Sequence, residues 1–176
     1  MKKISIFSRF IARINKEIKT LCTKKILIWG LIFLGIGVLN WILCSNGVRV
    51  ALFWSVPRCA MPIFLIYFVW AVSYFLIGAL IFACFYGIEK FRRHLIYKDI
   101  LILIIMQLFT YISYSLFWGA SAPFLSFLAL LVAAFVCFIE ILSLGKYFSL
   151  WTILLAIHFT WLLYNAYVCL AFAIIN

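Results

Sequence analysis

Long apolar stretches alternate with short polar or basic segments along this chain. From Ile100 to Ile139 the sequence has no charged residue, and a helix needs about 20 apolar residues to cross the hydrocarbon core of a bilayer. Continuous apolar runs without alternating polar positions favour helices over a membrane barrel. The pattern predicts an all-α integral membrane protein with five spans, at approximately residues 26–44, 62–85, 96–118, 122–144 and 149–175.

The third and fourth spans come from one charge-free run. The helix breakers Gly119 and Pro123 divide it, which predicts two passes joined by a tight turn. Five passes place the two ends of the chain on opposite sides of the membrane.

Basic residues are concentrated on one side of the predicted spans. The chain has 15 Lys and Arg against four acids, for a formal charge of +11. With the N-terminus inside, thirteen of these bases fall inside and only Arg49 and Arg58 outside. The positive-inside rule therefore predicts a cytoplasmic N-terminus and an outward C-terminus, and the charge indicates lipid headgroups rather than nucleic acid. We expect a bacterial cytoplasmic membrane, with the mitochondrial outer membrane as the alternative.

The segment 1–25 carries eight of the bases. Its apolar residues Ile4, Phe7, Ile11, Ile14, Ile18 and Leu21 are spaced alternately by three and four, which predicts a basic amphipathic helix lying at the membrane interface. A disordered basic tail or a targeting segment is the alternative. We treat residues 26–176 as the transmembrane domain.

Metal-binding and catalytic motifs are missing from the sequence. The six cysteines have no C-x-x-C spacing, and neither a phosphate loop nor H-E-x-x-H occurs, so we predict no metal site and no obligatory cofactor. Glu140 lies inside span four, either reaching toward Lys146 at the boundary, which we favour, or acting as an intramembrane carboxylate. A small transporter or channel would need polar residues along a path, for which the spans offer Glu140, His158, Gln107 and Asn165.

Two tryptophans lie well inside predicted spans, where an indole N–H needs a partner or a ligand. Trp70, Tyr74 and Gly78 share one face of span two at i, i+4 and i+8. Tyr164 extends the Trp161 face of span five. These two faces are able to enclose a flat apolar ligand, although on spacing alone we favour helix packing on Gly78 as the explanation of the first face.

These residues resemble motifs of the tryptophan-rich sensory protein, or translocator protein, family of five-span membrane proteins. A proline-containing first loop, bracketed by Pro57 and Pro62, leads into W-x-x-x-Y-x-x-x-G at Trp70, Tyr74 and Gly78. The third helix ends in Phe117-Trp118-Gly119, with Tyr111 where the family usually has Trp, and the last helix matches from Trp161 to Asn176. The acid of the family's fourth helix falls at Ala129.

The resemblance implies a pocket within the bundle, capped by the first loop, that binds a porphyrin such as haem or protoporphyrin IX for sensing, handling or transport. It implies a homodimer, and ligand contacts from the motif residues. Some bacterial members degrade porphyrin in light through two pocket tryptophans, which correspond to Trp70 and Trp161. The alternative functions are a transporter or channel, or a structural subunit of a membrane complex.

Overall fold

The computed structural model describes residues 24–51, 53–86, 96–145 and 149–176, together with residues 8, 11, 12, 14 and 15. The interfacial helix predicted over 1–25 lies almost entirely outside the described residues. So do Lys146 and the bases between the second and third spans, apart from Lys98.

The described chain folds into five long helices, which are α2 (Lys24–Ala51), α3 (Ile63–Tyr86), α5 (Ile96–Gly119), α6 (Pro123–Leu144) and α7 (Ser149–Ile175). All five are long and apolar enough to cross a membrane. The predicted all-α class and the five spans are therefore confirmed. Large apolar side chains such as Phe64, Phe109 and Phe135 are about two-thirds exposed on the outer faces, as lipid-facing positions require.

The first helix continues beyond its predicted end at Cys44. It runs to Ala51 because its last turns pack against α5, where the Asn46 side chain donates to the Gly119 carbonyl at 3.0 Å. At Gly47 an added Cβ would lie 1.7 Å from the Trp118 carbonyl oxygen. Only glycine allows the two backbones to approach this closely.

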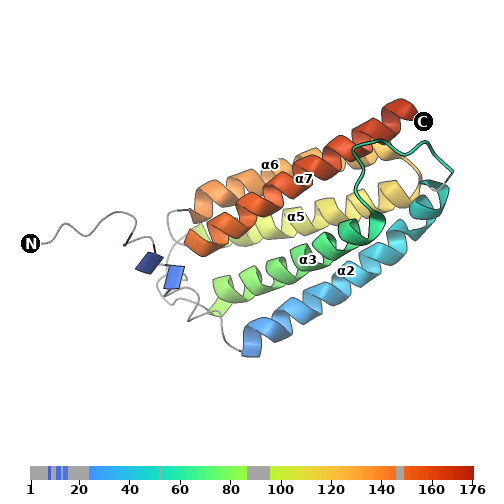
Figure 1. The fold of residues 1–176 in the computed structure, drawn as a ribbon. Helices are drawn as coiled ribbons and strands as arrows, with labels where there is room; N and C mark the ends of the chain where they lie inside the picture. The colour runs from blue at the N-terminus through green and yellow to red at the C-terminus, as the bar shows by residue number, and fades with distance from the viewer. Residues whose placement is uncertain are drawn as a thin grey trace, which may run out of the picture.

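The helices form a bundle in which each packs against its neighbours (Figure 1). Helix α2 contacts α3 and α5, while α6 contacts α5 and α7. The order around the bundle is therefore α3, α2, α5, α6, α7, and a hydrogen bond between Ser73 Oγ and His158 Nδ1 joins α3 to α7. The segment 53–62, the turn 120–122 and the C-terminus lie together at one end of the bundle, which we call the cap end.

The predicted tight turn between α5 and α6 is present, but glycine does not make it. Ser121 has the positive φ, 59°. The Ser121 N–H donates to Trp118 and the Ala122 N–H to Phe117, each at 2.9 Å, which is the pattern of a left-handed helix C-terminus. Pro123 then begins α6, where its missing N–H costs nothing.

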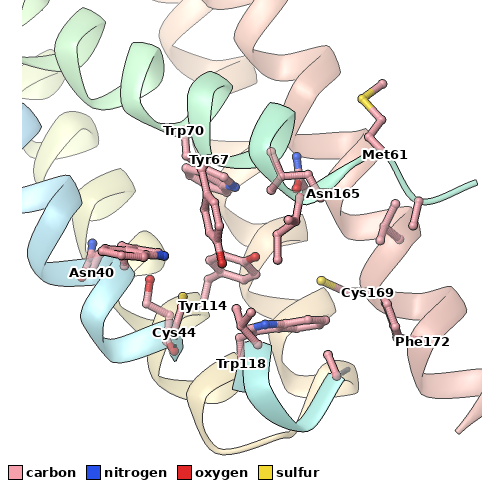
Figure 2. Close-up of a pocket in the computed structure, with 18 of the residues that line it drawn as sticks. Asn40, Cys44, Met61, Tyr67, Trp70, Tyr114, Trp118, Asn165, Cys169 and Phe172 are labelled. Carbon is pink, nitrogen blue, oxygen red and sulfur yellow. Dashed lines mark hydrogen bonds between the residues drawn. The ribbon is translucent and has the colours of Figure 1, made fainter. Parts of the chain in front are cut away.

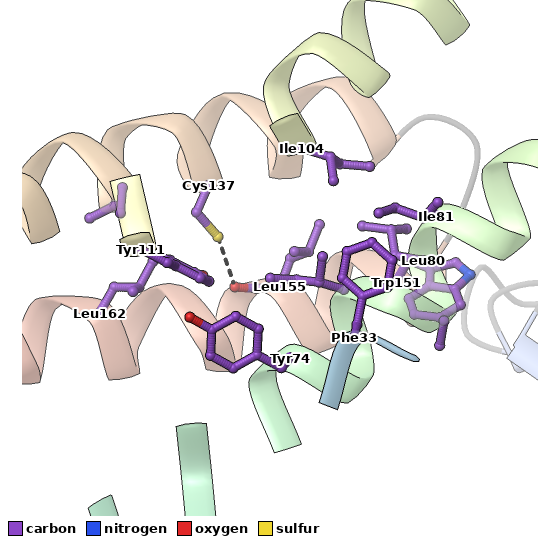
Figure 3. Packing of buried hydrophobic residues seen from close by; sticks show 14 of the residues in the cluster. Phe33, Tyr74, Leu80, Ile81, Ile104, Tyr111, Cys137, Trp151, Leu155 and Leu162 are labelled. Carbon is purple, nitrogen blue, oxygen red and sulfur yellow. Dashed lines mark hydrogen bonds between the residues drawn. The ribbon is translucent and has the colours of Figure 1, made fainter. Parts of the chain in front are cut away.

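The half of the bundle away from the cap end is closely packed (Figure 3). Leu80, Ile104, Cys137 and Leu162 are among its fully buried residues, and the Cys137 thiol donates to the Leu155 carbonyl at 3.6 Å. Space inside the bundle therefore lies toward the cap end.

Candidate functional site

A cavity of about 480 Å³ lies between the helices near the cap end (Figure 2). Helices α2, α3, α5 and α7 and the segment 53–62 all contribute to its lining, whereas α6 does not. Its volume falls within the range of about 300–1,000 Å³ that is typical of small-molecule sites.

Aromatic side chains form much of the cavity wall. Those that line it are Trp41, Tyr67, Trp70, Tyr74, Tyr114, Trp118 and Phe172. Trp70 of α3 stacks on Tyr114 of α5 with ring centroids 5.4 Å apart and an interplanar angle of 14°. The Asn40 side chain donates to the Tyr74 hydroxyl, which occupies the polar ends of both side chains and leaves a largely apolar wall.

The Trp70 indole is the unusual group in this wall. Its Nε1 is buried and has no hydrogen-bond partner. An N–H that is unpaired inside a membrane protein costs free energy, and Trp70 lines the cavity. The nitrogen itself has almost no accessible surface, so the ring of Trp70, rather than its N–H, is the part offered to a bound molecule.

The segment 53–62, which we call the cap, covers one side of the cavity and is held by helix α7. The Tyr164 hydroxyl donates to the Cys59 carbonyl at 2.9 Å and accepts from the Met61 N–H at 2.8 Å. The Asn176 side chain pairs with both backbone groups of Ser55, at 2.8 and 3.2 Å.

An aromatic cluster adds a third attachment of the cap. Trp54 packs on Phe172 of α7 and on Trp118 of α5, with ring centroids 6.0 and 6.3 Å apart. The cap is thereby fixed to two helices through residues that follow Trp54 by more than sixty positions in the sequence.

The structure brings some of the predicted site residues to the cavity. Trp70, Tyr74 and Pro62 line it. Pro57 is buried within the cap but does not line the cavity, and Tyr164 acts on the cap rather than on the wall. The predicted Phe117 belongs to the end of α5 and lies outside the lining.

Trp161 does not line the cavity with Trp70. It is buried and stacks on Tyr164 with ring centroids 5.4 Å apart, and its Nε1 also lacks a partner. The structure thus separates the two tryptophans that the sequence placed in one pocket, and puts Trp161 behind the residue that holds the cap.

Gly78 and Tyr111 serve packing rather than the cavity wall. A Cβ at Gly78 would lie 2.5 Å from the Trp29 carbonyl oxygen of α2, so the face below Tyr74 is filled by a helix. Tyr111 is fully buried and packs edge-on against Trp70 and Tyr74, with centroids 5.1 and 5.7 Å away. Tyr111 therefore supports the cavity wall from behind.

Several wall residues were not predicted from the sequence. Asn40, Tyr67 and Tyr114 carry no motif. Trp41 and Trp118 lie near span ends, where aromatic side chains are expected at the membrane interface without a ligand. The pairing of α2 with both α3 and α5 brings these positions together, and no spacing within one helix signals it.

The polar residues noted within the spans form a separate group. Glu140 is fully buried and its carboxyl group faces Gln107 of α5, whereas Lys146, the partner that the sequence suggested, lies outside the described residues. Gln107 contacts Tyr111, and Tyr111 bonds to His158. Of the four polar positions considered for a transport path, only Asn165 lines the cavity.

Cofactor and metal ligands are sparse around the cavity. Among the described residues no group of three His, Cys, Asp or Glu side chains is placed to hold a metal ion. The thiols of Cys44 and Cys169 line the cavity, and the Cys44 thiol donates to the Ser115 carbonyl at 3.8 Å. The wall is suited to holding an apolar molecule by contact rather than by coordination.

Comparison of the chain with protein-family models, with curated proteins and with solved structures finds no match. The cavity and its residues therefore carry the functional argument.

Proposed function

We propose that this protein binds a flat, largely apolar ligand of the tetrapyrrole class, haem or protoporphyrin IX, within its membrane-embedded cavity, for sensing, handling or transport. The observation that carries the proposal is the cavity of about 480 Å³ with its aromatic wall, in which Trp70 and Tyr114 are stacked. A tetrapyrrole offers large apolar faces to these rings.

The charges near the cap support the same class of ligand. Arg49 in the last turn of α2 and Arg58 in the cap are exposed at the cap end. Each lies within two positions in the sequence of residues that line the cavity. Propionate groups of a tetrapyrrole buried in the cavity would reach toward these cations.

The residues present fit metal-free protoporphyrin IX better than haem. No histidine lines the cavity in the part of the chain that the structure describes, and the lining thiols of Cys44 and Cys169 are the available soft ligands. Membership of the translocator protein family is part of this proposal, supported by the five-helix bundle and by the cap leading into Trp70 and Tyr74.

The test is a titration of the full-length protein in lipid nanodiscs with protoporphyrin IX, in which binding is measured by the quenching of tryptophan fluorescence. Loss of a well-packed aromatic contact costs about 2–4 kcal/mol, so Trp70→Leu should weaken binding at least tenfold and Trp70→Phe by less. The matched control is Trp151→Phe, because Trp151 is buried but does not line the cavity.

Trp161→Phe distinguishes the cavity from the arrangement that the family resemblance implies. We expect a smaller effect than for Trp70→Phe, because Trp161 does not line the cavity. Equal weakening by Trp70→Leu and Trp151→Phe, or no saturable binding by the parent protein, would remove the tetrapyrrole proposal.

A further inference from the structure

A continuous chain of buried polar side chains crosses the bundle beside the cavity. It runs from Glu140 on α6 through Gln107 and Tyr111 on α5 to His158 on α7 and Ser73 on α3. All five residues are at least nine-tenths buried. In a membrane a buried carboxyl group is expensive, and it usually marks a function.

One hydroxyl proton fixes the direction of this chain. The Ser73 hydroxyl donates to the Val69 carbonyl at 2.8 Å, and it has no second proton to give. The bond of 3.1 Å to His158 Nδ1 must then be donated by His158. A neutral His158 protonated on Nδ1 accepts at Nε2, and Tyr111 O–H is the donor at that position.

The same reasoning reaches Glu140. The Tyr111 proton is used on His158, so its oxygen accepts from the Gln107 amide nitrogen at 2.9 Å. The Gln107 oxygen then faces Glu140. Two acceptors do not bond, so Glu140 must carry a proton and donate it to Gln107. In this direction every hydrogen bond of the chain has a donor and an acceptor.

Ionised Glu140 requires the opposite direction. With its amide turned, Gln107 donates to the two carboxylate oxygens at 3.1 and 2.8 Å and accepts from Tyr111 at 2.9 Å. Tyr111 must then accept from His158 Nε2–H, and His158 Nδ1 must accept from Ser73. The Ser73 bond to Val69 is lost. His158 changes tautomer by releasing its Nδ1 proton and binding one at Nε2, so the net change is the loss of the Glu140 proton alone.

We propose that Glu140 is a proton-binding site within the membrane bundle, and that taking up or releasing its proton reverses the hydrogen bonds of the chain from Gln107 to Ser73. The titratable groups that face Glu140 are Tyr111 from α5 and Cys137 from its own helix; His158 of α7 reaches it through Tyr111. Lys146, the base nearest to it in the sequence, lies outside the described residues.

Tyr111 connects this site to the cavity. Its ring packs on Trp70 and Tyr74, both of which line the cavity, so the reversal takes place directly behind the wall. An effect of the proton on ligand affinity rests on the proposed function, whereas the proton site itself does not.

The test uses infrared difference spectra of the full chain in lipid nanodiscs without ligand, recorded across a pH titration. We expect the carbonyl stretch of one protonated carboxylic acid, which is lost as the pH rises. Glu140→Gln should abolish this band, because glutamine has no carboxylic acid, while its amide N–H keeps a donor toward Gln107. Asp99→Asn, which replaces an exposed acid near the start of α5, should leave it unchanged.

Tyr111→Phe tests whether the protonation of Glu140 is coupled to the hydrogen bonds that run from Gln107 to Ser73. Without the hydroxyl, Gln107 is free to keep its amide nitrogen toward Glu140, which favours the carboxylate. We therefore expect the proton affinity to fall about tenfold, the equivalent of one hydrogen bond. The exposed Tyr167 provides the control, Tyr167→Phe, which should leave the titration unchanged.

A band that persists in Glu140→Gln, or a carboxyl group that keeps one protonation state at every pH, would overturn the proton site. An unchanged midpoint pH for the loss of the carboxylic acid band in Tyr111→Phe would show that the proton of Glu140 is not coupled to the other hydrogen bonds. Because no ligand is present, a failure of protoporphyrin binding is recorded separately in the fluorescence titration and does not alter these outcomes.

Discussion

Replacing Tyr164 by Phe should loosen the cap while leaving the bundle folded. The variant removes one hydroxyl, which donates to the Cys59 carbonyl and accepts from the Met61 N–H. The ring itself, stacked on Trp161, is retained. The change therefore acts on two backbone groups of the cap and on little else.

The magnitude follows from the two hydrogen bonds. Each contributes about 0.5–1.5 kcal/mol net, so their loss should ease local opening of the cap by roughly 1–3 kcal/mol. Met61 is exposed, and water replaces part of the lost bonding. The expected result therefore lies at the lower end, with amide exchange in the cap about five- to tenfold faster.

Hydrogen–deuterium exchange of the protein in nanodiscs, measured by mass spectrometry on the peptide that contains 53–62, checks this. Tyr167→Phe is the control because Tyr167 is an exposed tyrosine of the same helix. Unchanged exchange in the cap would refute the attachment. Faster exchange throughout α7 would show instead that Tyr164 supports the helix as a whole.

Three further predictions concern packing, the turn and the thiols. Gly47→Ala should lower the free energy of unfolding by about 1–3 kcal/mol, because its Cβ would overlap the Trp118 carbonyl; an unchanged melting temperature in detergent would contradict the close approach. Ser121→Gly should raise the free energy of unfolding by about 0.5–1 kcal/mol. This net value is the gain from relieving the positive φ minus the cost of the greater freedom of glycine in the unfolded chain, and a lower melting temperature would contradict it. A maleimide should label Cys59 in the cap quickly but Cys137 only after unfolding, because Cys137 is fully buried; equal rates measured by intact mass would show that the bundle opens.

The span pattern predicted the helices because apolar length alone determines whether a segment crosses lipid. The end of α2 was missed for a tertiary reason. Four of the five residues from Ser45 to Arg49 are polar or glycine and indicate a loop, but Asn46 and Gly47 are held by the end of α5. Contacts of this kind have no signal within the segment itself.

The candidate site was predictable only as far as single helix faces. The i, i+4, i+8 spacing correctly placed Trp70, Tyr74 and Gly78 along α3, but it does not tell which part of that face meets a helix and which meets a cavity. Glu140, Gln107 and His158 were each noted as polar. Their connection depends on the hydroxyl of Tyr111, which contacts Gln107 of its own helix and His158 of α7, and the contact between helices has no signal in the spacing along either one.

The attachment of the cap has a consequence for how the protein is made. The cap residues are synthesised before any of their partners. These partners belong to α5, to α7 and to Asn176, which follows α7. During insertion the cap therefore lacks its partners on α7 until that helix has entered the bilayer. Closure of the cavity by the cap therefore requires α7, and a chain that lacks this helix would leave the aromatic wall uncovered.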